Sequence, residues 1–157
     1  MITYDKILEY IETIKSKNYK EITVLFLSNF NNFVLNNYLT FHLGQNNLKT
    51  KFIKSEYDQI NQEIFNLRLN KKINKINYLI IGYDINSKLN FGEFLIEKYI
   101  NNIKNNIDEI LNNKSLKNVN IIHFNLSLSE NIFFYPTNDY HIFFKKINSF
   151  NKYLNRI

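Results

Sequence analysis

Three residues of this 157-residue chain could together carry out nucleophilic catalysis: Ser28, Asp139 and His141. A serine hydroxyl attacks a carbonyl only when a base takes its proton, and a histidine base needs a carboxylate that orients its ring. Ser28 directly follows the apolar run ITVLFL, and the sequence NDYH supplies an acid and a base near the other end of the chain. Such a set would hydrolyse an ester or transfer its acyl group.

Each of these residues also has an ordinary structural explanation. Ser28 and Asn29 could end a strand and cap the helix that follows it. Asp139 could be a turn residue after Pro136, and His141 could be a hydrogen-bonded polar group at the start of a helix. From the residues alone, both interpretations stay open.

The composition excludes several other kinds of site. The chain has no cysteine, which rules out disulfides, thiol catalysis and cysteine-bound zinc or iron–sulfur clusters. It has no glycine-rich phosphate loop, and no two aspartates stand one residue apart, as in haloacid-dehalogenase-type phosphatases. His42, His123 and His141 lack the spacing of metal ligands, and we expect structural roles for His42 in a helix and His123 in a strand. We therefore expect no metal and no cofactor.

Composition also limits the class of protein. Hydrophobic residues make up 45% and aromatic residues 16% of the chain, enough to form the core of one domain spanning residues 1–157. The net charge is +6, but asparagine alone makes up roughly a fifth of the chain, far above ordinary usage, which indicates an AT-rich genome. The basic run at 68–75 is then a solvated loop or a patch for an acidic partner. No signal peptide or membrane span is evident, so we expect a cytoplasmic protein, with nucleic acid an unlikely partner.

Hydrophobic periodicity predicts the elements that must position these residues. Apolar runs predict strands at 22–27, 49–53, 77–82 and 119–124, the first buried on both faces. Helical spacing predicts helices over 3–17, 31–43, about 91–111 and 142–155, with a short helix within 55–66. We expect Gly44 to end the second helix in a left-handed conformation, and we expect Leu95 and Leu111 on the apolar stripe of the long helix.

This alternation predicts a three-layer α/β/α sandwich with a mostly parallel sheet, of the SGNH-hydrolase or flavodoxin type. Ligands of such sheets bind outside the carboxyl ends of the strands. The residues that matter most are therefore those that follow each strand: Ser28-Asn29, Ser55-Glu56, Tyr83-Asp84 and Asn125-Leu126.

The candidate triad resembles that of SGNH hydrolases, in which the first strand ends in Gly-Asp-Ser and the last loop carries Asp-x-x-His. Aligning the apolar run places Ser28 on the glycine, Asn29 on the aspartate and Phe30 on the nucleophile. In the last loop, Asn138 stands at the position of the acid, and Asp139 is one residue out of register. A phenylalanine cannot attack a carbonyl, so the resemblance implies the fold more than the chemistry.

The chain is also similar, over nearly its whole length, to the N-terminal region of FkbH-like proteins. That region has a strand ending in Ser-Asn-Phe-Thr and then Tyr-Asp-Gln-Tyr-x-Gln-Glu-Ile, which SNFN at 28–31 and YDQINQEI at 57–64 match in most positions. In the family this SGNH-like domain precedes a haloacid-dehalogenase-type catalytic domain. The family is implicated in loading a glyceryl unit from a phosphorylated glycerate onto an acyl carrier protein, in polyketide or surface-polysaccharide pathways.

The resemblance implies an SGNH-like module that is not catalytic alone. It would bind a catalytic partner of the haloacid-dehalogenase type, an acyl carrier protein or a small acyl-type ligand. The residues expected to line or shape the crevice are Asn29, Tyr57, Asp58, Gln59, Gln62, Asp84 and Asn125. The alternatives are an active esterase or acyltransferase that uses Ser28, Asp139 and His141, and a flavodoxin-like scaffold without a ligand.

Overall fold

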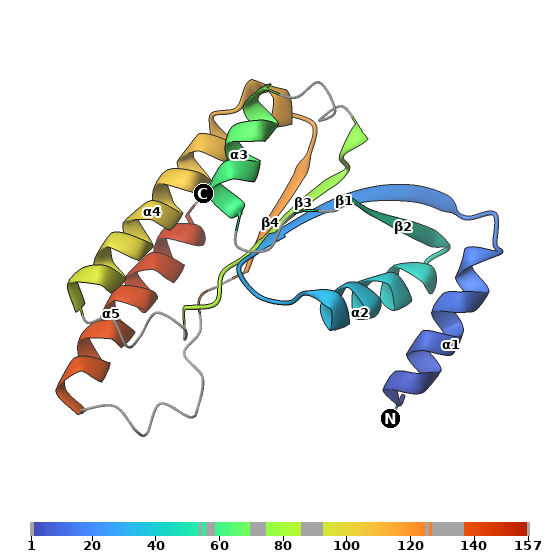
Figure 1. Ribbon diagram of the computed structural model, residues 1–157, viewed down its shortest axis with the longest axis horizontal. Coiled ribbons are helices and arrows are strands. Elements are labelled where there is room, and N and C mark those ends of the chain that lie inside the picture. Colours follow the sequence, from blue (N-terminus) through green and yellow to red (C-terminus); the bar gives the residue numbers. More distant parts are fainter. Residues whose placement is uncertain are drawn as a thin grey trace.

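The computed structural model describes residues 2–53, 55, 59–69, 75–85, 93–124, 126 and 137–156, with only the backbone described for 68–69, 93–94 and 137–144. Helices and strands alternate along these residues (Figure 1). The elements are α1 (Tyr4–Lys15), β1 (Lys20–Ser28), α2 (Phe33–Gly44), β2 (Leu48–Ile53), α3 (Ile60–Leu69), β3 (Tyr78–Gly82), α4 (Glu93–Leu111), the 3-10 turn η3 (Lys114–Leu116), β4 (Asn120–His123) and α5 (Thr137–Leu154).

The four described strands form one parallel sheet in the order β2-β1-β3-β4. The predicted α/β class is therefore confirmed. β1 lies between β2 and β3, and its final residues are buried on both faces, as its uninterrupted apolar sequence indicates. The chain passes from β1 to β2 on one side and then crosses back over β1 to β3 on the other side. The strand order therefore reverses between β1 and β3. Parallel α/β sheets bind ligands at the carboxyl ends of the two strands on either side of such a reversal.

Helices cover both faces of the sheet, which makes three layers (Figure 1). The larger core lies between the sheet and helices α3, α4 and α5, where Leu79 and Ile81 of β3 meet Ile103 and Phe150. The smaller core lies on the α2 side, where Phe26 and Ile80 pack with Leu35 and Leu39. Among the helices of the described residues, none is long and apolar enough to cross a membrane.

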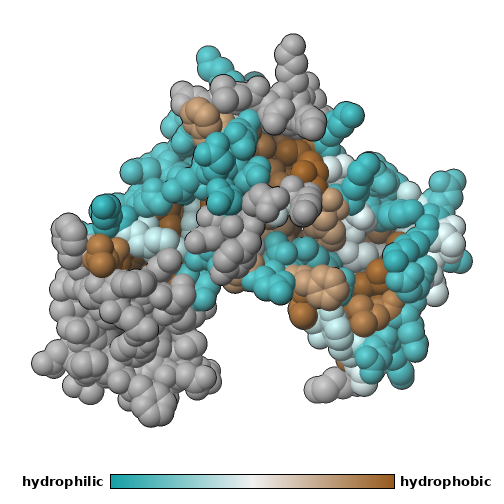
Figure 2. All heavy atoms as spheres, viewed as in Figure 1, coloured by the Kyte–Doolittle hydropathy of each residue, from teal (hydrophilic) through white to brown (hydrophobic). Residues whose placement is uncertain are grey.

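Helix α2 is apolar on its outer side as well. Leu35 and Leu39 face the sheet, whereas Phe33 and Val34 at the start of the helix are 63% and 52% exposed. Figure 2 shows hydrophobic side chains gathered at the surface over this part of the molecule. An apolar surface of this kind is typical of an interaction site.

Three predicted features of the helices are wrong, and the first is the start of the last helix. α5 begins at Thr137 rather than at residue 142, so Asp139 and His141 lie on helical backbone and not in a loop. The sequence directly before α5 is compatible with this start, because proline is tolerated at the beginning of a helix and an acid in the first turn is favoured by the helix dipole.

The apolar stripe of α4 also differs from the predicted one. Leu95 and Leu111 are 45% and 48% exposed, although both were expected to be buried. The buried side chains are those of Ile96, Ile100, Ile103, Ile107 and Ile110. The two leucines each neighbour a member of this stripe, and one residue turns a helix by about 100°, which points them away from the sheet.

Gly44 does not end α2 in the left-handed conformation that we expected. Gly44 is the last residue of the helix and is followed by Gln45 in a right-handed conformation, and among the described residues other than glycine a positive φ occurs at Asn47, at 58°. Gly44 instead allows α1 to approach, because a Cβ atom at this position would lie 2.0 Å from Cδ1 of Ile14 and 3.3 Å from Cε1 of Tyr10.

We therefore expect Gly44→Ala to lower the free energy of unfolding by about 1–3 kcal/mol, the usual cost of overpacking a buried contact. Ile14→Val removes the Cδ1 atom that clashes, so the double variant should recover part of this loss. Urea unfolding of the wild type, both single variants and the double variant measures this coupling. Strictly additive effects would show that the close contact between α1 and α2 is not the reason for the glycine.

Candidate functional site

Ser28 ends β1 opposite Gly82 of β3, at the edge of the sheet predicted to bind a ligand. Its hydroxyl donates a hydrogen bond to the Phe30 carbonyl over 2.9 Å and accepts one from Nδ2 of Asn32 over 3.3 Å. The side chain is only 6% exposed. The proton that a nucleophile would give to a base is therefore held in the turn between β1 and α2. Asn32 stands at the N-cap position of α2, so Ser28 ends the strand but does not cap the helix.

Asn29 joins the ends of the two central strands. Its Oδ1 accepts a hydrogen bond from the Asp84 N–H over 2.6 Å, and its Nδ2 donates to the Asp84 carbonyl over 2.9 Å. The same Nδ2 donates to the Tyr99 hydroxyl of α4, also over 2.9 Å. The amide thus prolongs the pairing of β1 with β3 beyond Gly82, and at 7% exposure it is shielded from water.

Phe30 occupies the position beside Gly82. A Cβ atom at Gly82 would lie 2.9 Å from two carbon atoms of the Phe30 ring. The ring also meets Phe26 edge-on, with centroids 6.2 Å apart. The residue aligned with the nucleophile of SGNH hydrolases is therefore part of the hydrophobic core on the α2 side.

On the other face of the sheet, Tyr83 belongs to a buried polar group that connects three elements. Nδ2 of Asn106, on α4, donates to the Tyr83 hydroxyl over 2.9 Å and to Oδ1 of Asn61, on α3, over 2.6 Å. Burial raises the pKa of Tyr83 to about 12, although the hydrogen bond from Asn106 acts in the opposite direction. Tyr83 is therefore uncharged at neutral pH and serves as a hydrogen-bond acceptor.

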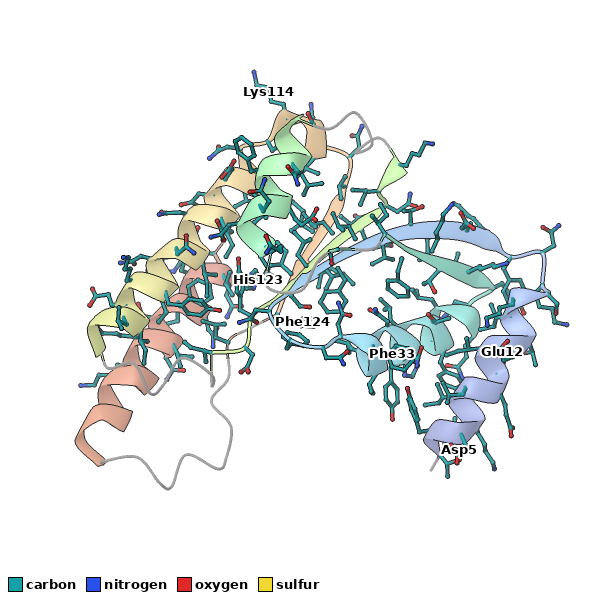
Figure 3. The ribbon with its side chains drawn as sticks, viewed as in Figure 1. Asp5, Glu12, Phe33, Lys114, His123 and Phe124 are labelled. Atoms are coloured by element: carbon teal, nitrogen blue, oxygen red, sulfur yellow. The ribbon has the colours of Figure 1, made fainter. Side chains whose placement is uncertain are left out.

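His123 ends β4 and stacks on the Tyr83 ring at a centroid distance of 5.7 Å. Phe150 of α5 meets the same imidazole edge-on at 6.0 Å. Figure 3 marks His123 beside its neighbour Phe124, which packs on Phe26 in the opposite core. Within the described part of the chain, no hydrogen bond of ordinary geometry reaches either ring nitrogen of His123, and the backbone of Phe124 acts only as a weak partner that partly offsets the effect of burial on the His123 pKa.

This environment predicts a pH-dependent stability. Burial lowers the pKa of His123 below the ordinary value of 6.5, so the unfolded chain binds the proton more tightly than the folded protein does. The stabilising contribution is complete above pH 6.5 and is lost as the pH falls from there through the lowered pKa of the folded protein. Thermal unfolding followed across this range should show a falling midpoint, and His123→Phe should flatten that slope. An unchanged slope in the variant would assign the effect to other groups.

The other predicted site residues do not lie together in the described part of the structure. Gln59 and Gln62 are exposed, and Nε2 of Gln62 donates to Oδ1 of Asn66 one turn along α3. Tyr57, Asp58 and Asn125 lie outside the described residues, as do the side chains of Asp139 and His141. Of the predicted set, the structure therefore joins Asn29 and Asp84 by hydrogen bonds, whereas the Ser28 hydroxyl bonds to Phe30 and Asn32 instead.

Two residues of these hydrogen-bonded groups were not predicted as site residues: Tyr99, which accepts from Asn29, and Asn106, which donates to Tyr83. Asn106 lies on the buried stripe of α4 between Ile103 and Ile110. A polar residue at a buried helical position is a usable signal, because such a group needs a partner. In a chain so rich in asparagine, that signal does not stand out.

An open cavity of about 850 Å³ lies at the surface along α4, and Tyr99 is part of its lining. Its lining on the described side is Leu95, Glu97, Lys98, Tyr99, Asn101, Asn102 and Asn105. Tyr99 connects the cavity to Asn29 through the hydrogen bond given above. Its amides and one lysine could bind the polar groups of a small ligand. The described residues contain no group of three or more histidines and acids that could hold a metal ion.

Comparison with known proteins gives one similar structure. No protein-family model and no curated protein matches the sequence. The structure is described as the N-terminal part of the protein BF1531 from Bacteroides fragilis, containing a phosphatase domain and complexed with Mg. It matches with a TM-score of 0.74 and 15% identity over 99% of this chain but only 42% of that chain. At this identity the match shows that the two chains share a fold. This chain spans less than half of the length of the other chain.

Proposed function

We propose that this chain is a non-catalytic SGNH-like module that binds a catalytic partner in a biosynthetic pathway of the FkbH-like kind. The observation that supports this proposal most is that the residues at the end of β1 are engaged in hydrogen bonding and core packing. The Ser28 hydroxyl donates to the Phe30 carbonyl, and the Phe30 ring packs into the core against Gly82. An oxygen so engaged, with an apolar ring at the nucleophile position, suits a binding module better than an esterase.

Two further observations support a partner. The apolar residues Phe33 and Val34 are exposed directly after the strand end, at a place where a bound protein would cover them. The similar structure contains a phosphatase domain, and this chain accounts for only 42% of its length. A phosphatase-type catalytic domain, as in FkbH-like proteins, is therefore the partner class that we propose.

The non-catalytic part of the proposal is tested by hydrolysis of p-nitrophenyl acetate. Wild type, Ser28→Ala and the matched control Ser16→Ala, which changes the exposed serine directly after α1, should release nitrophenol at the same rate. Circular dichroism confirms that each variant is folded. Turnover that depends on Ser28 but not on Ser16 would overturn the proposal in favour of the esterase alternative.

The partner is tested by isothermal titration of the purified chain with the phosphatase-type protein encoded nearest to it. We expect binding to wild type and loss of binding with Phe33→Lys. Leu8→Lys is the matched control, since Leu8 is also an exposed apolar residue, at 37%, but lies on α1. Absence of binding to wild type, or equal binding to both variants, would count against α2 as the docking surface.

The cavity beside α4 favours a second candidate, a small acyl-type ligand bound at the strand ends. Lys98 could pair with a carboxylate, and the amides of α4 could bind hydroxyl groups. Titration of the protein with glycerate, followed by amide NMR, should shift resonances of residues 98–105. An unchanged spectrum at saturating glycerate would exclude glycerate as that ligand.

A further inference from the structure

The two edges of the sheet differ in a way that indicates a function for one of them. β2 forms one edge and β4 the other (Figure 1). β2 carries Lys49 and Lys51, and charged residues, lysine above all, are a common protection of sheet edges against pairing with other chains. Lys51 lies 3.7 Å from Glu21 of the neighbouring strand, and Lys49 donates to the Lys15 carbonyl. This edge is therefore occupied by charged side chains.

Within the described part of the chain, β4 lacks charged residues of this kind. Its residues, Asn120 to His123, include no lysine, acid or proline. Ile121 and Ile122 are 36% and 41% exposed. Ile121 pairs with Leu79 and Ile122 with Ile80, so the two isoleucines lie on opposite faces of the sheet. A strand that is apolar on both faces is typical of the interior of a parallel sheet, yet this one lies at the edge.

Among the described residues, no strand pairs with the side of β4 that faces away from β3. The N–H groups of Asn120 and Phe124 donate to carbonyls on the β3 side. Because successive groups of a strand alternate in direction, the N–H and C=O groups of Ile121 and His123 point to the open side. An open edge of this kind is a template for another strand.

We propose that β4 pairs with β4 of a second copy of this chain, antiparallel and about a two-fold axis through Ile122. In an antiparallel pair, opposite residues share a face of the sheet. This axis places Ile122 opposite its own copy and Ile121 opposite His123. Ile121 and His123 then exchange both of their outward hydrogen bonds with the other copy, and Ile122 forms the closer pair without hydrogen bonds.

The charges fit a second copy. No charged residue lies on β4, so the symmetric pair brings no like charges opposite one another. Lys114 and Lys117 line a groove of about 360 Å³ next to the edge, together with Leu111 and Ile121. They precede β4, so the antiparallel arrangement separates the lysines of the two copies to opposite ends of the paired strands.

Light scattering coupled to gel filtration, across a series of protein concentrations, tests this proposal. Wild type should approach the mass of two chains as the concentration rises, whereas Ile122→Lys should stay at the mass of one chain. Ile122 is already well exposed, so the fold should survive, which circular dichroism checks. Leu8→Lys, at similar exposure on α1, should behave as wild type.

Hydrogen exchange resolves the register. As the concentration rises, exchange of the Ile121 and His123 amides should slow, while that of Ile122, which faces β3, should not change. A wild type that remains a single chain at every concentration overturns the proposal. A dimer that survives Ile122→Lys, or that forms without protection of these two amides, overturns it equally.

Discussion

We expect Phe150→Ala to lower the free energy of unfolding by about 3–5 kcal/mol, the range found for removing a large aromatic side chain from a core. Phe150 has no exposed surface. It packs against His123 at 6.0 Å and against Tyr153 at 6.1 Å, so it holds α5 to the end of β4. Truncation would leave a cavity that the neighbouring strand and helix cannot close, because both are fixed by other contacts. Urea unfolding measures the loss.

Phe65→Ala is the matched control for this prediction. The same atoms are removed, but Phe65 lies on α3 and is 49% exposed. The free energy of unfolding should therefore fall by only about 0.5 kcal/mol. Similar losses for the two variants would mean that α5 is not anchored to the sheet through Phe150.

Asn29→Ala is the second change with a large expected effect, a loss of about 2–4 kcal/mol. The Asn29 amide makes three hydrogen bonds to Asp84 and Tyr99. Its removal takes these partners from the half-buried N–H and C=O groups of Asp84, and loss of a hydrogen-bond partner from a group shielded from water costs about 1–3 kcal/mol. Asn46→Ala is a suitable control, because the Asn46 amide donates to the His42 carbonyl at an exposed site, and its loss should cost much less.

Asn29→Asp separates geometry from packing at the same position. The carboxylate keeps an acceptor for the Asp84 N–H but places its second oxygen against the Asp84 carbonyl. That repulsion raises the pKa of the new carboxyl in the folded state, so this variant should gain stability relative to wild type as the pH falls and the group is protonated. Chemical denaturation at several pH values measures this, and a constant difference from wild type would contradict the geometry.

The local sequence determined the order of elements and the parallel sheet. A run such as ITVLFL has no polar face to expose, so it forms a strand covered on both sides. The isoleucines of α4 are spaced to give one stripe whatever they pack against. Such features depend on neighbours in the chain, so periodicity predicts most of them, although it wrongly included Leu95 and Leu111 in the buried stripe.

The tertiary structure decided which distant residues each of these side chains contacts. Gly44 was expected to end a helix, but its lack of a side chain serves contact with Ile14 of α1, from a distant part of the sequence. Asn29 joins Asp84, 55 positions away, and Asn106 joins Tyr83 and Asn61. The sequence likewise presents β4 as an interior strand, and only the strand order reveals it as an edge. Hydrogen bonds and close contacts of this kind depend on distances between segments far apart in the chain, and a one-dimensional pattern of apolar and polar residues contains no such distances.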